Sequence, residues 1–140
     1  MDRKLLSDKS LKVLVADDQP AIRMVLAAIL KKKGLEVVQA EDGEEALNQI
    51  REHHDISLIM IDLKMPGMDG FEFIEAVRES DLAKGVPIVM ITGLTNTETI
   101  ETAKKLGVDG WIAKPFQHER ILDTVFRLLE SKPQPSESAS

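Results

Sequence analysis

The stretch KVLVADDQP (residues 12–20) joins a short apolar run to two adjacent carboxylates and a proline. Four of its first five residues are apolar, as in a strand buried inside a parallel sheet. Asp17 and Asp18 then place two like charges side by side, which costs free energy unless a cation lies among them. The stretch therefore predicts a buried strand that opens into a charged site.

Four further apolar runs follow, and amphipathic stretches separate them. The expected strands cover residues 13–16, 35–38, 56–61, 86–91 and 111–113. Three of the runs are rich in Val and Ile and nearly continuous, which is typical of strands buried on both faces. Repeats of strand then helix predict an α/β fold, a (βα)5 doubly wound sheet of five parallel strands with helices on both faces.

Apolar residues three or four positions apart mark five helices. Their expected apolar anchors lie within residues 22–30, 46–50, 71–77, 100–103 and 121–129. Asp69 with Glu72 should cap the third helix, and Thr95 with Glu98 the fourth. Gly107 should end the fourth helix.

Composition limits the possible functions. The chain has 140 residues, which suits one domain, expected at residues 11–131 between an N-terminal extension (1–10) and a disordered tail or linker (132–140). Its net charge of −6 disfavours general binding to nucleic acids or anionic membranes. The lack of cysteine excludes disulfides and thiolate sites. Without a signal-peptide pattern or a membrane-length apolar segment, a cytoplasmic location is expected.

Polar side chains follow the ends of the expected strands, where open parallel sheets bind ligands. Asp17 and Asp18 follow the first strand, Asp62 the third, Thr92 the fourth and Lys114 the fifth. Clustered carboxylates suit Mg²⁺, which keeps positions open for phosphate oxygens. A lysine and a hydroxyl can contact the same phosphoryl group, and a carboxylate can act as its nucleophile.

Each of these residues also has a purely structural explanation. Asp17 or Asp18 alone would serve as a helix cap, and Asp62 as a helix cap or a turn residue. Thr92 alone would be a structural hydroxyl, and Lys114 a solvated charge. Their common position at the strand ends of one sheet favours a site over five separate structural roles.

The segments VLVADD, IMIDLKMPGMDG, VMITG and GWIAKPF, in this order and spacing, resemble response-regulator receiver domains of two-component signalling. The resemblance covers about residues 10–131 and is closest in kind to stand-alone chemotaxis regulators. It implies a flavodoxin-like sheet with strand order 2-1-3-4-5. It also implies a phosphorylation-activated switch that is no enzyme beyond catalysing its own phosphorylation and dephosphorylation.

By this resemblance, Asp62 is the phosphoacceptor and takes a phosphoryl group from the phosphohistidine of a histidine kinase. The cofactor would be Mg²⁺. Asp18 would bind it directly, Asp17 largely through water, and Asp62 and the backbone carbonyl of Lys64 would complete the protein ligands.

The resemblance also assigns the residues that read the phosphoryl group. Lys114 would pair with a phosphoryl oxygen, and its bond to Pro115 would be cis. Thr92 would bond the phosphoryl group in the active state. Trp111 stands where the family has an aromatic switch residue, usually Tyr or Phe, so its role as a switch competes with that of a static aromatic.

The expected partners are a histidine kinase or histidine phosphotransfer protein near the first helix, and a downstream protein on the face of the fourth helix, fifth strand and fifth helix. The alternatives are a phosphorylation-independent binding module and a receiver fragment of a larger regulator. A flavin carrier is disfavoured because two aspartates follow the first strand. An aspartate phosphatase is disfavoured because Lys64 stands where that class has a second aspartate.

Overall fold

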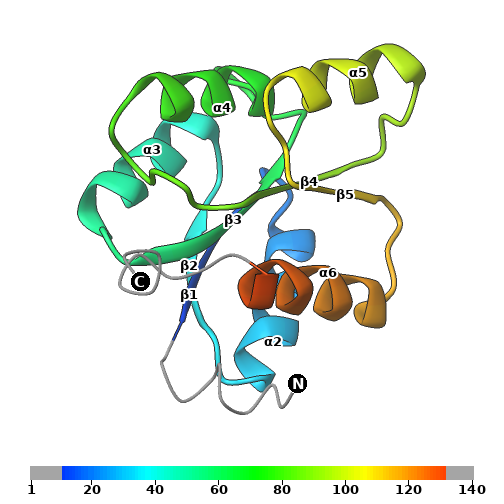
Figure 1. Ribbon diagram of the computed structural model, residues 1–140. Helices are drawn as coiled ribbons and strands as arrows, with labels where there is room; N and C mark the ends of the chain where they lie inside the picture. The colour runs from blue at the N-terminus through cyan, green and yellow to red at the C-terminus, as the bar shows by residue number, and fades with distance from the viewer. Residues whose placement is uncertain (1–10, 132–140) are drawn as a thin grey trace.

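A five-stranded parallel sheet forms the centre of the molecule, with its strands in the order β2-β1-β3-β4-β5 (Figure 1). The computed structural model describes residues 11–131, so the expected extension 1–10 and tail 132–140 lie outside the described residues. The strands are β1 (Lys12–Ala16), β2 (Glu36–Ala40), β3 (Ile56–Asp62), β4 (Ile88–Thr92) and β5 (Gly110–Ala113). The helices are α2 (Pro20–Lys32), α3 (Gly43–Glu52), α4 (Gly70–Glu79), α5 (Thr97–Lys105) and α6 (His118–Ser131). The predicted α/β class and strand order are confirmed. Within residues 11–131, no helix has the length and apolar character needed to cross a bilayer.

Two apolar cores lie on opposite faces of the sheet. Helices α3, α4 and α5 cover one face, and α2 and α6 cover the other (Figure 1). Since strand side chains alternate, Val13 and Val15 enter the core under α2 and α6, whereas Leu14 enters the core under α3 and α4. This two-sided burial explains why β1 and β3 appear in the sequence as nearly continuous apolar runs.

Every strand differs from its predicted bounds at one end or both, and the differences of two residues are at the start of β4 and the end of β2. Strand β4 begins at Ile88, not at residue 86, because Pro87 has no amide hydrogen for the ladder. The carbonyl of Pro87 still accepts a hydrogen bond from Ile59 N, at 3.0 Å. Strand β2 runs on to Ala40, two residues beyond the prediction, because it stays in register with β1 up to the pair of Ala16 and Ala40.

One of the two predicted helix caps is wrong. Asp69 and Glu72 form the expected capping box at the start of α4. Helix α5 is capped by Asn96 and not by Thr95, since the Asn96 side chain accepts a hydrogen bond from Thr99 N at 2.8 Å. Asn is a stronger N-cap residue than Thr, so α5 begins one residue later than predicted.

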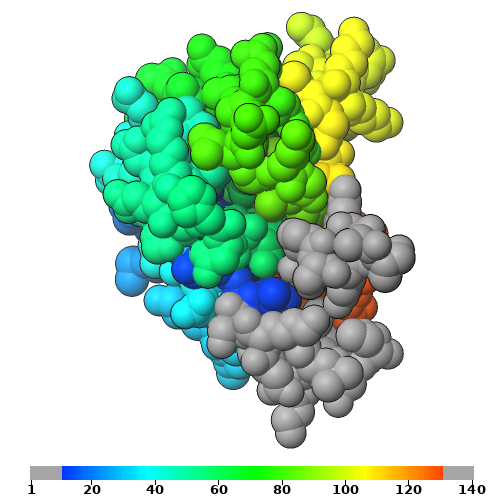
Figure 2. Space-filling model, turned by 60° about the vertical axis from the view of Figure 1, so that its left-hand side comes forward, coloured from blue at the N-terminus to red at the C-terminus, as the bar shows by residue number. Residues whose placement is uncertain are grey.

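Helix α5 is anchored less firmly than α4. Among the residues of α5, all within the described part, Ala103 alone is buried. Helix α4 by contrast buries Phe73, Ile74 and Val77. Figure 2 shows α5, in yellow, standing at the margin of the surface formed by α3 and α4. Little apolar burial therefore opposes a local movement of α5.

Replacing Asn96 by Ala should increase amide hydrogen exchange in α5 with little loss of global stability. Loss of an N-cap costs about 1 kcal/mol, which makes local opening roughly 5-fold more frequent. Native-state hydrogen exchange followed by NMR measures this opening.

Asp69→Ala is the matched comparison, because it removes the cap of the well-anchored helix α4. This variant should lower the global free energy of unfolding by about 1 kcal/mol in urea denaturation. An equal global loss in both variants would contradict the weak anchoring of α5.

Candidate functional site

Three carboxylates converge at the carboxyl edge of the sheet. Asp17 and Asp18 follow β1, and Asp62 is the last residue of the adjacent strand β3. One oxygen of each carboxylate lies within 4.8 Å of the others. Asp17 is 1% exposed and Asp62 6%, whereas Asp18 is exposed. The strand order therefore concentrates negative charge at one partly buried point.

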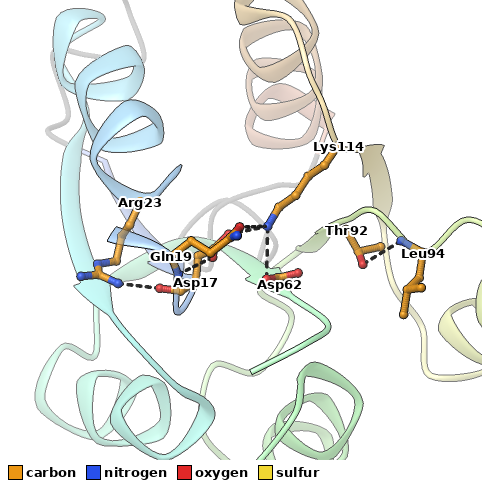
Figure 3. A network of polar contacts seen from close by, with 7 residues as sticks. All are labelled: Asp17, Gln19, Arg23, Asp62, Thr92, Leu94 and Lys114. Atoms are coloured by element: carbon orange, nitrogen blue, oxygen red, sulfur yellow. Dashed lines mark hydrogen bonds and ion pairs between the residues drawn. The ribbon is translucent and has the colours of Figure 1, made fainter. Parts of the chain in front are cut away.

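Lys114 supplies a positive charge from beyond β5. Its Nζ donates to Asp17 Oδ2 at 2.9 Å and to Asp62 Oδ2 at 3.2 Å (Figure 3). A longer bond of 3.3 Å runs to Gln19 Oε1. The bond between Lys114 and Pro115 is cis, as the resemblance implied. One ammonium therefore faces three carboxylates, and a net negative charge is left among these groups.

The pKa values follow from this charge balance. Burial, and then the charge of Asp17, raise the pKa of Asp62, although Lys114 opposes the rise. Burial by itself lowers the pKa of Lys114, but its hydrogen bonds and ion pairs with Asp17 and Asp62 outweigh burial and raise it. Lys114 therefore stays charged, and the ionised form of Asp62 is disfavoured until another cation joins the site.

The donor set fits a hard divalent cation. The carboxylates of Asp17, Asp18 and Asp62 offer only oxygen atoms, and their excess charge favours a cation such as Mg²⁺. Lys64 lies two residues beyond Asp62, and it lines an open pocket of about 690 Å³ together with Asp18 and Leu94. A chemical group that reaches the carboxylates has room beside them.

Thr92 and Trp111 lie near the carboxylates in the fold without bonding to them. Thr92 ends β4 and is buried, and its Oγ accepts a hydrogen bond from Leu94 N at 3.2 Å (Figure 3). Within residues 11–131 this hydroxyl makes no hydrogen bond to the side chain of Asp62 or Lys114, although the Lys114 amide donates to the Thr92 carbonyl oxygen at 3.0 Å. Trp111 in β5 is half-buried against the core under α3 and α4. The structure thus unites four of the predicted side chains, but not these two.

The structural explanations for the acidic residues do not apply. The N-cap of α2 is Gln19, and that of α4 is Asp69. The caps are therefore other residues, and none of the three carboxylates at the site (Asp17, Asp18 and Asp62) caps a helix.

Two residues that contact the site were missed by the sequence prediction. Gln19 bonds Lys114, and Arg23 Nη1 donates to the carbonyl oxygen of Asp17 at 2.6 Å (Figure 3). Their spacing of four places both on one side of the first turn of α2. Neither residue carried a signal in the sequence, because polar residues in the first turn of an amphipathic helix are ordinary.

Two regulators of known sequence are similar to this chain. The probable transcriptional regulator ycf27 of Porphyridium aerugineum is 40% identical over 111 residues, covering 79% of this chain and 44% of the relative. The DNA-binding response regulator MtrA of Mycolicibacterium smegmatis is 32% identical over 130 residues, covering 92% and 55%. The chain thus spans about half the length of these two relatives.

Solved structures match over nearly their whole length. The chemotaxis protein CheY4 of Vibrio cholerae is 40% identical with a TM-score of 0.80, and the match covers 84% of this chain and 98% of that one. The receiver domain of NtrX from Brucella abortus is 32% identical with a TM-score of 0.78, covering 86% and 99%. The family model described as "Response regulator receiver domain" matches residues 13–126. The chain therefore belongs to the response regulator receiver domains of two-component signalling.

Proposed function

We propose that this receiver domain is a phosphorylation-activated switch that accepts a phosphoryl group on Asp62. The observation that carries the proposal is the contact of the buried Asp62 carboxylate with Lys114 Nζ, at 3.2 Å, inside a cluster of carboxylates. The donor is the phosphohistidine of a histidine kinase or histidine phosphotransfer protein. The domain catalyses only its own phosphorylation and dephosphorylation. We also propose that it is located in the cytoplasm.

The transfer needs a nucleophile, and it needs a cation that pairs with the negative charge of the transferred phosphoryl group. An Asp62 carboxylate oxygen attacks phosphorus, the bond from phosphorus to the histidine nitrogen breaks, and the electron pair returns to the imidazole. Lys114 is placed to pair with an oxygen of the transferred group. The Thr92 hydroxyl, which now accepts from Leu94 N, still has its own proton to donate to a phosphoryl oxygen.

The protein ligands proposed for Mg²⁺ are the carboxylates of Asp17, Asp18 and Asp62 and the backbone carbonyl of Lys64. Asp17 would act largely through water, since its two oxygens already accept bonds from Gln19 N and Lys114 Nζ. Bound there, Mg²⁺ would neutralise the excess charge on the carboxylates and on the phosphoryl group.

The output surface proposed is the face formed by α5, β5 and α6. Helix α5 is weakly anchored, and Trp111 in β5, Leu94 and Leu106 are partly buried against the same apolar core. A new bond from the Thr92 hydroxyl to a phosphoryl oxygen would draw the hydroxyl, and with it the bonded Leu94 amide, towards the phosphate and bias this region towards a second conformation. Trp111 would move with it, and a downstream protein would bind the changed face.

The docking surface proposed for the phosphodonor protein is the exposed face of α2. Met24 is 66% exposed and Val25 41%, and Ala21 and Ala28 extend the same apolar stripe. The stripe begins two residues after Gln19, which contacts Lys114. A helix of the phosphodonor protein that packs along this stripe would therefore come close to the carboxylate cluster.

Incubation with a phosphohistidine protein donor and Mg²⁺ should add one phosphoryl group to the wild-type chain. Asp62→Asn should abolish the addition because it removes the nucleophile, and EDTA should suppress it. Asp42→Asn is the control, since Asn keeps the cap of α3 at the same edge of the sheet. Intact-mass spectrometry distinguishes these outcomes. An unmodified wild-type chain would favour the phosphorylation-independent binding module.

In metal-free buffer, Asp62→Asn should stabilise the fold at neutral pH. The folded pKa of Asp62 is raised, so its cost is absent below the unfolded value of about 3.9 and grows as pH rises through the folded pKa. The gain should be on the order of 1 kcal/mol at neutral pH and vanish below about pH 4. Urea denaturation across this pH range measures it. A variant less stable than wild type at neutral pH would contradict the charge balance described for the site.

Met24→Glu should slow phosphotransfer from the protein donor by about 10-fold or more, because a charge replaces an apolar contact. Phosphorylation by acetyl phosphate should be unchanged, since this small donor needs no docking surface. Asn48→Glu adds the same charge to the exposed face of α3 and should change neither rate. Equal slowing with both donors would argue against α2 as the docking helix.

A further inference from the structure

Arg23 joins the acidic loop to three separate elements. Its Nη1 donates to the carbonyl oxygen of Asp17 at 2.6 Å, and its Nε donates to Gln39 Oε1 at 3.3 Å. Figure 3 shows the first bond reaching from α2 to the loop after β1. Gln39 belongs to β2, and its carbonyl oxygen accepts a bond from Gln49 of α3 at 3.3 Å. The half-buried guanidinium therefore ties the loop to α2, β2 and, through Gln39, α3.

The bond to Arg23 completes the fixation of Asp17. The Asp17 amide donates to Ala40 O at 3.1 Å, and its carboxylate accepts bonds from Gln19 N at 2.9 Å and Lys114 Nζ at 2.9 Å. The carbonyl oxygen is the remaining polar group of the residue, and Arg23 holds it. Asp17 is thus fixed through every polar atom that it has.

Asp18 depends on this fixation more than Asp17 does. The carbonyl of Asp17 and the amide of Asp18 share one planar peptide unit, so a bond to the carbonyl sets the direction in which Asp18 leaves the loop. Within residues 11–131 no hydrogen bond holds the exposed Asp18 carboxylate. Its direction is therefore set by the backbone, and Arg23 fixes that backbone.

We propose that Arg23 is a positioning residue for the Mg²⁺ site, acting through the peptide plane between Asp17 and Asp18. This inference rests on the proposed function and adds a residue to it. Arg23 touches neither the metal nor the phosphoryl group, and it acts by holding the Asp18 carboxylate at the point where the cation binds.

Positioning and plain electrostatics predict opposite signs for the loss of Arg23. A guanidinium close to a cation site repels the cation, so on charge alone Arg23→Met should tighten Mg²⁺ binding. If Arg23 positions the loop, the same variant should weaken binding about 10-fold, the lower end of the loss seen when a partner of a metal ligand is removed.

The two divalent cations sharpen the distinction. Mg²⁺ demands near-ideal octahedral geometry at short range, whereas Ca²⁺ accepts irregular and longer coordination. A loosened loop should therefore weaken Mg²⁺ binding more than Ca²⁺ binding. A change of charge, or general damage to the fold, would alter the two affinities in parallel.

The experiment is isothermal titration of the full chain with Mg²⁺ and with Ca²⁺, in wild type, Arg23→Met, Arg23→Lys and Gln39→Leu. Arg23→Lys keeps the charge without the rigid fork and should bind Mg²⁺ with intermediate affinity. Gln39→Leu leaves Arg23 in place, removes its second bond, and should weaken Mg²⁺ binding about 3-fold, less than Arg23→Met does. It also provides the test if the Arg23 variants fail to fold, which thermal melts without metal would reveal.

Selective loss of Mg²⁺ affinity in the folded variants supports the inference. Unchanged or tighter Mg²⁺ binding, or parallel losses for both cations, overturns it while leaving the proposed function intact. A wild-type chain that binds no Mg²⁺ and accepts no phosphoryl group overturns both.

Discussion

The ion pairs of Lys114 with Asp17 and Asp62 hold the carboxyl edge of the sheet together. Strands β1 and β3 are neighbours at the centre of the sheet, so the carboxylates at their carboxyl ends lie close together. Lys114 reaches them from the end of β5, two strands away from β3, and bonds to both. This arrangement settles where the loops after β1, β3 and β5 must lie. It also leaves a negative charge that makes the site receptive to a cation.

The two apolar cores stabilise the fold enough to tolerate the clustered carboxylates at the carboxyl edge of the sheet. Residues of β1 and β3 are almost fully buried on both faces, and their burial stabilises the sheet independently of the charged loops. The desolvated Asp62 carboxylate is a local cost that such cores offset. Proteins commonly keep unfavourable groups where their chemistry is needed. The weak anchoring of α5 fits the proposed switch, because little apolar burial would oppose a movement of this helix.

The sequence predicted the features that depend on patterns along the chain. Buried strands appear as continuous apolar runs, and the acidic pair, Asp62 and Lys114 follow those runs directly, so their convergence could be inferred from strand order. The end of β2 could not be inferred, since it depends on register with β1. The roles of Gln19 and Arg23 were hidden for a similar reason. One bonds a lysine far along the chain and the other bonds a main-chain carbonyl, and neither contact leaves a pattern in the sequence.

Helix α2 begins without a side-chain cap, and this has a consequence for how the protein can be changed. Gln19 occupies the N-cap position, yet its side chain bonds Lys114 and leaves the first turn of the helix uncapped. A Ser or Asp at this position would add about 1 kcal/mol of helix stability. It would also take from the Lys114 ammonium its one uncharged hydrogen-bond partner among the described residues. Thermostability and the electrostatic setting of the lysine are therefore competing demands on a single residue, so a search for stabilising substitutions that starts at this helix would alter the site as well.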